Sequence, residues 1–185
     1  MQDYSDWTLF LDRDGVINQR IPDAYINHWD DFRFARGAEA ALQKLQKRFA
    51  RLIIVTNQQG IAKKIMTTAQ LNRLHERMLG VLETQDVRID GIYFCGESKT
   101  QVNNCRKPAP AMGLQAQTDF PDINFQRSIM VGDSISDLQF GRNLGMQTIL
   151  ITSKKEEAKL WDQHHKDWDQ KFPSLKAWSD SLNLL

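Results

Sequence analysis

The sequence predicts an α/β fold, a Rossmann-like three-layer α/β/α sandwich with a mainly parallel sheet. Short apolar runs alternate along the chain with segments in which apolar residues recur at helical spacing. This alternation is typical of parallel strands joined by right-handed helical crossovers, which cover both faces of the sheet. With 185 residues and 41% hydrophobic content, the chain is long enough for one full core, so we expect residues 1–185 to form a single domain.

The first half of the chain contains three of the expected strands. Apolar or β-branched runs too short for helices predict strands at residues 8–11, 52–56 and 91–94. Apolar residues at helical spacing predict helices at residues 37–49 and from residue 67 or 68 to residue 82. Thr67 or Thr68 is expected to cap the second helix, because a threonine hydroxyl can accept a hydrogen bond from a free backbone N–H.

The second half continues the alternation. Further strands are expected at residues 128–133 and 147–151. Pro108 and Pro110 suit the first turn of a helix that runs to residue 119, and Gly145 ends a helix that begins at residue 135. From residue 153 onward we expect two helical pieces separated by a break at residues 171–173.

Four polar clusters follow the predicted strands or lie in the segments that leave them, namely DRDG, TNQQG, CRKP and GDSISD. In a parallel α/β sheet, ligands bind at the carboxyl ends of the strands, so these clusters are expected to meet at one edge. Asp12 and Asp14 point the same way in extended chain because one residue separates them, and Gly15 permits a sharp turn. Asp133 and Asp137 add negative charge to the same edge.

This gathering of carboxylates requires a cation, because unit charges ~4 Å apart repel by about 4 kcal/mol at an effective dielectric constant near 20. A small number of hard oxygen ligands favours Mg²⁺, which commonly shares its coordination shell with a substrate phosphate. Lys107 and the hydroxyl of Thr56 suit phosphoryl oxygens. The residues therefore predict hydrolysis of a phosphate monoester through an aspartyl phosphate, with Asp12 attacking phosphorus and Asp14 as general acid and base. Since Asp14 would start protonated, we expect its anionic neighbours to raise its pKa.

The motifs DRDGVIN, VTNQQGIA, CRKPAP and VGDSISD resemble those of the haloacid dehalogenase (HAD) superfamily of Mg²⁺-dependent phosphatases. Within it, the chain is similar to a small-capped branch that includes heptose bisphosphate and histidinol phosphate phosphatases. The resemblance implies a HAD-like fold with a minimal cap, with Asp12 as nucleophile and Asp14 as acid and base. It implies a set of phosphate- and substrate-binding residues, Thr56, Asn57, Gln58, Arg106 and Lys107. For Mg²⁺ it implies ligation by Asp12, the carbonyl of Asp14, and Asp133. Asp137, one helical turn after Asp133, is a candidate for an outer layer around the ion.

The chain departs from the resemblance at residues 95–105, which read CGESKTQVNNC. Relatives often carry a zinc loop of four Cys and His ligands here, but Glu97 and Asn103 stand at two of the ligand positions, so we expect no structural zinc. Cys95 and Cys105 are too few for a disulfide scaffold and are expected to be buried thiols. Ser134 stands where relatives often have Lys.

The segment at residues 19–36 is too long for a tight turn and is a candidate specificity loop, in which Tyr25 and His28 could contact a polar substrate. Its resemblance to heptose bisphosphate phosphatases, in the Tyr followed by DDFRF, favours a sugar phosphate such as D-glycero-D-manno-heptose 1,7-bisphosphate over histidinol phosphate. A phospho-acceptor binding module is a different alternative, disfavoured because no lone aspartate ends the second or third strand. A non-catalytic relative is disfavoured because every catalytic position is filled.

Charge and composition limit the expected partners. Lys and Arg number 24 and Asp and Glu number 23, a formal charge of +1 without a long block of one sign, so neither nucleic acid nor a membrane is an expected partner. The first residues are acidic where a signal peptide would be basic, and no apolar run approaches the ~18 residues that span a bilayer. We therefore expect a cytoplasmic monomer that acts on a small phosphorylated molecule.

Overall fold

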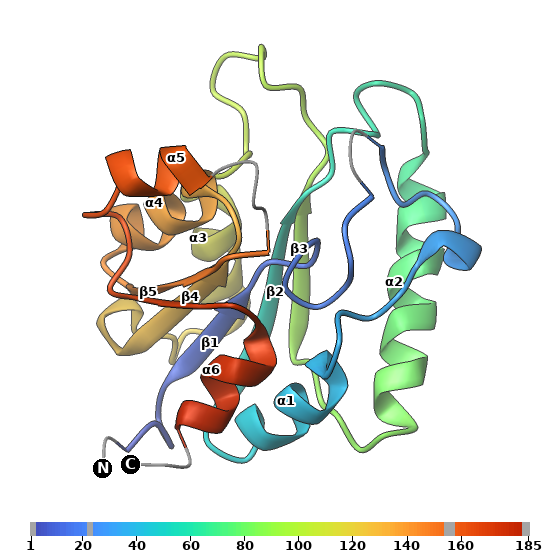
Figure 1. Cartoon of the computed structure of the whole chain (residues 1–185). Helices are drawn as coiled ribbons and strands as arrows, with labels where there is room; N and C mark the ends of the chain where they lie inside the picture. Colours follow the sequence, from blue (N-terminus) through green and yellow to red (C-terminus); the bar gives the residue numbers. More distant parts are fainter. Residues whose placement is uncertain (1–2, 22–23, 154–157, 183–185) are drawn as a thin grey trace.

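The computed structural model describes residues 3–21, 24–153 and 158–182. Its sheet has six parallel strands in the order β3-β2-β1-β4-β5-β6, which confirms the predicted α/β class (Figure 1). The strands are β1 (Thr8–Leu11), β2 (Arg51–Asn57), β3 (Gly91–Cys95), β4 (Ser128–Gly132), β5 (Gln147–Ile151) and β6 (Gln170–Phe172). The α-helices are α1 (Ala38–Leu45), α2 (Thr68–Glu83), α3 (Ala111–Asp119), α4 (Ile135–Leu144), α5 (Ala158–Gln163) and α6 (Leu175–Ser181). Short 3₁₀ helices lie at η1 (Trp29–Asp31) and η2 (Phe125–Arg127).

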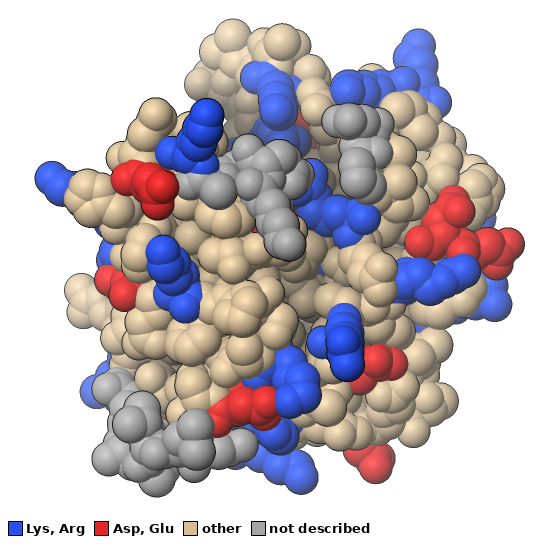
Figure 2. Space-filling view, in the orientation of Figure 1, with Lys and Arg blue, Asp and Glu red and all other residues tan. Residues whose placement is uncertain are grey.

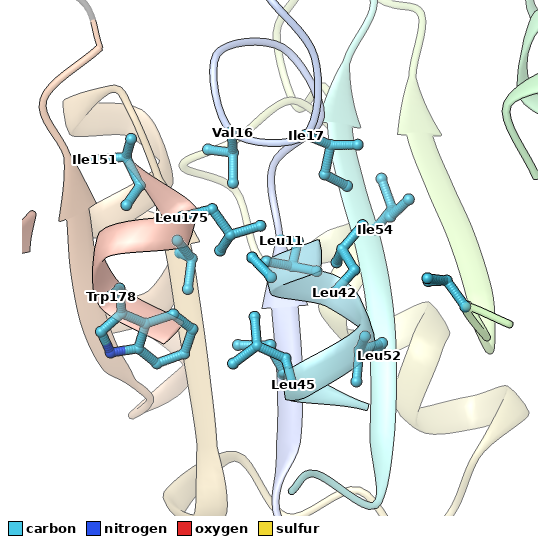
Figure 3. Packing of buried hydrophobic residues seen from close by; sticks show 14 of the residues in the cluster. Leu11, Val16, Ile17, Leu42, Leu45, Leu52, Ile54, Ile151, Leu175 and Trp178 are labelled. Atoms are coloured by element: carbon cyan, nitrogen blue, oxygen red, sulfur yellow. The ribbon is translucent and has the colours of Figure 1, made fainter. Parts of the chain in front are cut away.

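The two faces of the sheet are buried under different helices. Side chains alternate along a strand, so Leu9 and Leu11 of β1 pack with residues of α1, α2 and α6, whereas Phe10 packs with residues of α3 and α4. Figure 3 shows Leu42 of α1 and Leu175 of α6 over the first of these faces, beside Leu11. Burial of each such side chain stabilises the fold by about 1.5–3 kcal/mol, and it fixes the register of the central strands from which the polar loops emerge.

The helix ends follow the predicted signals. Thr67, not Thr68, caps α2, because its Oγ1 accepts from the N–H of Gln70 while the Gln70 side chain accepts from the N–H of Thr67. Gly145 ends α4 in the left-handed conformation at φ +80°. Within the described residues, no helix is both long enough and apolar enough to cross a membrane.

The structure corrects two expectations. Residues 170–172 form strand β6 beside β5, where we predicted only a break between helices. A strand of three residues is too short to show a periodic pattern, and its place depends on pairing with β5. Cys95 and Cys105, which we expected as thiols, form a disulfide, because the loop between them returns to the end of β3 and brings their Cα atoms to 5.6 Å.

Candidate active site

Segments that lie far apart in the sequence meet at the carboxyl edge of the sheet. Asp12 follows β1, Thr56 is the next-to-last residue of β2, Asp133 follows β4, and Lys107 lies between β3 and α3. They line a pocket of about 800 Å³. All the side chains predicted for the site line this pocket, namely Asp12, Asp14, Thr56, Asn57, Gln58, Arg106, Lys107, Asp133 and Asp137.

Lys107 is the buried cation of the site. Its Nζ donates to Asp12 Oδ1 at 2.8 Å and to the carbonyl of Val55 at 2.7 Å, and it lies 2.7 Å from Asp137 Oδ1. Burial by itself lowers the pKa of Lys107, but the charges of Asp12 and Asp137 raise it overall, so the side chain is a fixed positive charge. The side-chain amide of Asn57, which is predicted to bind phosphate, is hydrogen-bonded to the backbone of Lys107. Its Oδ1 accepts from the N–H at 2.9 Å and its Nδ2 donates to the C=O at 3.3 Å.

Three buried carboxylates form a candidate metal site. Asp12, Asp133 and Asp137 place one oxygen each within 4.8 Å of the others. When ionised, the three carboxylates carry more negative charge than Lys107 and Arg20 together can balance. Arg20 Nη1 lies 3.7 Å from Asp133. Carboxylate oxygens with an excess of negative charge are the donors that Mg²⁺ prefers, so these residues fit the expected ion.

The electrostatics of these carboxylates agree with a site built for a cation. Burial raises the pKa of Asp12 to about 7, with Asp137 and Asp14 adding to the rise and Lys107 opposing it. Burial, followed by the charges of Asp12 and Asp137, also raises the pKa of Asp133 well above its ordinary value. Asp137 lies inside this cluster, with Oδ1 paired to Lys107 and Oδ2 accepting from Ser134 Oγ at 2.7 Å. Its place in an outer layer around the ion stays a prediction.

Asp14 lies at the pocket wall and is surrounded by donors. Arg13 Nη2 donates to its two carboxylate oxygens at 2.9 and 3.1 Å, Asn18 Nδ2 donates at 2.9 Å, and Gln58 Nε2 donates at 2.8 Å. Although burial raises the pKa of Asp14, the charge of Arg13 and these hydrogen bonds lower it overall. The expected rise in the pKa of Asp14 is therefore wrong for this arrangement.

Gly15 lets the loop after β1 approach the acidic cluster. Its φ of +94° lies in the left-handed region, and a Cβ atom there would lie 2.0 Å from Asp133 Oδ2. Asp133 occupies this space beside the backbone while accepting from Ser153 Oγ at 3.0 Å. Any larger residue at position 15 must displace the carboxylate.

Basic side chains also line the pocket. Its lining includes the basic residues Arg20, Lys63, Lys99 and Arg106. Tyr25, from the predicted specificity loop, also lines it, with Lys63 Nζ 5.3 Å from the centre of its ring. In Figure 2, Lys and Arg side chains are spread over the visible face of the molecule, including its upper part. His28 is not among the described residues that line the pocket, so the prediction that His28 contacts substrate has no support here.

Cys95, Glu97 and Cys105 are also close enough together to bind a metal, with one potential ligand atom each within 4.8 Å of the others. In this structure the two sulfur atoms are bonded to each other, and Glu97 Oε2 accepts from the N–H of Cys105 at 2.7 Å. The expectation that this loop binds no structural zinc stays a prediction.

Sequence reasoning missed two buried residues beside the site. The long side chain of Arg13 turns back to pair with Asp14 and is fully buried. His75 of α2 is buried against Arg13, with its Nε2 at 2.9 Å from Arg13 Nη1. The DRDG motif marks Arg13 in the sequence, whereas nothing in the sequence links His75 to it.

Fold and site together define a class of protein, an α/β enzyme in which carboxylates and a lysine meet at the carboxyl edge of a parallel sheet. A family model described as HAD-hydrolase-like matches residues 104–176. The chain belongs to the HAD-like hydrolases, as its motifs predicted, and the expected enzyme class, a phosphatase, is confirmed by relatives that carry that name.

Three relatives show how far the similarity extends. The D-glycero-beta-D-manno-heptose-1,7-bisphosphate 7-phosphatase of Escherichia coli is 40% identical over 167 residues, which cover 83% of this chain and 86% of that protein. The D-glycero-alpha-D-manno-heptose-1,7-bisphosphate 7-phosphatase of Mycobacterium tuberculosis is 38% identical over 138 residues, 75% of this chain and 73% of that protein. The crystal structure of D,D-heptose 1,7-bisphosphate phosphatase from B. bronchiseptica, complexed with magnesium and phosphate, has a TM-score of 0.86 at 27% identity and covers 96% of this chain and 98% of its own.

Proposed function

We propose that this chain hydrolyses the 7-phosphate of D-glycero-D-manno-heptose 1,7-bisphosphate with Mg²⁺ as cofactor, through an aspartyl phosphate on Asp12. The observation that carries the proposal is the contact between Asp12 and Lys107, 2.8 Å apart at a pocket that also holds Asp133. A carboxylate beside a fixed cation can approach a phosphate dianion that would otherwise repel it. Heptose bisphosphate phosphatases that match most of the chain support the choice of substrate.

In the first step, an oxygen of Asp12 attacks phosphorus in line with the bond to the sugar oxygen, which breaks as the acyl phosphate forms. Lys107 and the hydroxyl of Thr56 stabilise the charge on the phosphoryl oxygens. Asp12 and Asp133 would hold Mg²⁺, which when bound would supply further positive charge against the same repulsion.

Asp14 acts as the general acid of the first step and the general base of the second. It gives a proton to the departing sugar oxygen, and in the second step it takes a proton from the water that hydrolyses the acyl phosphate. Arg13 and the hydrogen bonds lower the pKa of Asp14, which favours the ionised form that the second step needs. A proton must therefore reach Asp14 before the sugar leaves.

The basic side chains of the pocket support a substrate with two phosphates. When one phosphate lies against Asp12, the other can pair with the basic residues Lys63, Lys99 and Arg106 of the same lining. Charged hydrogen bonds from such side chains to phosphate are the stronger kind. A substrate with one phosphate and an imidazole, such as histidinol phosphate, would leave these cations without an anionic partner.

The test is phosphate release from the α and β anomers of the heptose 1,7-bisphosphate, and from histidinol phosphate, with Mg²⁺ and with chelator. We expect Mg²⁺-dependent turnover and a higher kcat/KM for one of the heptose anomers than for histidinol phosphate. The reverse ranking would overturn the choice of substrate. A single phosphoryl transfer per chain without turnover would favour the phospho-acceptor module instead.

A further inference from the structure

A buried chain of hydrogen bonds connects α2 to Asp14. His75 Nε2 lies 2.9 Å from Arg13 Nη1, and Arg13 Nη2 donates in turn to both carboxylate oxygens of Asp14. Arg13 has no exposed surface and His75 is 6% exposed, so water cannot readily replace either partner. The His75 ring also packs edge-on against Phe94, with ring centres 6.0 Å apart, which restricts its rotation.

The direction of these bonds is fixed by chemistry. A guanidinium group has only donors, so Nε2 of His75 must be the acceptor and must carry no proton. The imidazole is therefore neutral, with its proton on Nδ1. A protonated ring would turn an N–H toward the Arg13 guanidinium and would place two positive charges together in a buried site.

Arg13 needs this acceptor to keep its orientation. Buried polar groups are almost always hydrogen-bonded, and a guanidinium whose Nη1 lost its partner would rotate to find another. Any such rotation moves Nη2, and with it the two bonds that fix the carboxylate of Asp14 at the pocket wall. Asn18 and Gln58 each give Asp14 one more bond, but neither replaces the two-point contact with Arg13.

We propose that His75 is a positioning residue for the phosphatase reaction, which acts through Arg13 to hold the Asp14 carboxyl where it exchanges protons with the leaving group. The inference rests on the proposed function, in which Asp14 protonates the departing oxygen. His75 touches no substrate in this account, and its effect is confined to steps that use Asp14.

Leaving-group chemistry separates this role from a merely structural one. A sugar alkoxide is a poor leaving group and needs a proton, whereas p-nitrophenolate leaves without one. In single-turnover measurements of leaving-group release, we expect His75→Leu to slow the reaction of the heptose bisphosphate about tenfold, a part of the 10²- to 10⁴-fold that general acid–base catalysis supplies. The rate of p-nitrophenolate release from p-nitrophenyl phosphate should stay within about twofold of the wild-type rate, since this leaving group hardly needs protonation by Asp14.

Two further variants complete the test. His75→Gln keeps an oxygen acceptor for Arg13 and should restore most of the rate with the heptose bisphosphate. Met78→Ala is the matched control, because Met78 lies one turn further along α2 and is fully buried in the apolar core. It should lower the melting temperature while changing the release rates of both esters by the same factor.

Equal slowing of both esters in His75→Leu, unchanged release of both, or a His75→Gln variant as slow as His75→Leu would each overturn the positioning role. A wild-type chain that releases neither leaving group would overturn the proposed function instead. Melting curves of His75→Leu show whether the variant folds, and the ratio between the two esters is insensitive to a reduced fraction of active protein.

Discussion

The ammonium group of Lys107 lies 2.8 Å from Oδ1 of Asp12, although 95 residues separate the two in the sequence. Both side chains are buried, and Lys107 shares its charge with Asp137 at 2.7 Å. The contact joins the segment before α3 to the end of β1. It therefore serves both the fold, by pairing buried charges, and the proposed chemistry, by offsetting the charge of the nucleophile.

Replacing Lys107 with Met should lower kcat for phosphate release by roughly 10²- to 10³-fold, because a preorganised positive charge is lost at the phosphoryl group. It should also lower the free energy of unfolding by about 3–5 kcal/mol, since two buried carboxylates lose their cation. Phosphate assays and urea unfolding measure the two effects.

The control for this change is Lys44→Met. Lys44 pairs with Asp180 at 2.5 Å, but the pair is exposed. Its loss should change the free energy of unfolding by no more than about 1 kcal/mol and leave kcat as in wild type. If Lys107→Met retains the wild-type kcat, the role assigned to Lys107 is wrong.

Gly15→Ala should abolish most of the activity. The new Cβ would lie 2.0 Å from Asp133 Oδ2, so the carboxylate must leave the cluster or the loop must shift. Gly145→Ala is the matched control, because Gly145 also has a positive φ, of +80°, but a Cβ there meets nothing within 4 Å. We expect Gly145→Ala to lose about 1 kcal/mol of stability from backbone strain alone, with normal kcat. Equal activities for the two variants would show that the crowding at Gly15 does not matter.

Mg²⁺ should stabilise the folded chain by mass action, since it binds the native cluster and not the unfolded chain. At a hundredfold excess over its dissociation constant, the gain is about 2.7 kcal/mol, measurable as a rise in melting temperature that chelator reverses. Asp133→Asn should remove this rise along with the activity. Asp122→Asn, at an exposed partner of Arg51, should preserve both. If Mg²⁺ does not change the melting temperature of the wild-type chain, the proposed metal site is wrong.

The ends of the strands could be predicted well from the sequence, and with them the site. Asp12 and Asp133 follow apolar runs, and topology alone brings such residues to one edge. The surroundings of Asp14 could not be predicted, because they depend on how the long side chain of Arg13 turns back and on the amide of Gln58. The sequence therefore predicts a shift of the Asp14 pKa in the wrong direction. Strand β6 could not be predicted because three residues are too few to show an alternating pattern of apolar side chains. Its position depends on pairing with β5.

His75 should make the chain less stable in acid. Burial, and then the charge of Arg13, lower its pKa from an ordinary 6.5 to about 3, so below pH 6.5 the unfolded chain takes up a proton that the folded chain does not. The free energy of unfolding should therefore fall by about 1.4 kcal/mol for each pH unit between these values, with the contribution intact at higher pH. Urea unfolding across this range should show a shallower pH dependence for His75→Gln than for wild type, by about that slope. Because all other titrating groups are common to both chains, parallel curves would mean that His75 accepts a proton in the folded state and that its bond to Arg13 is not maintained.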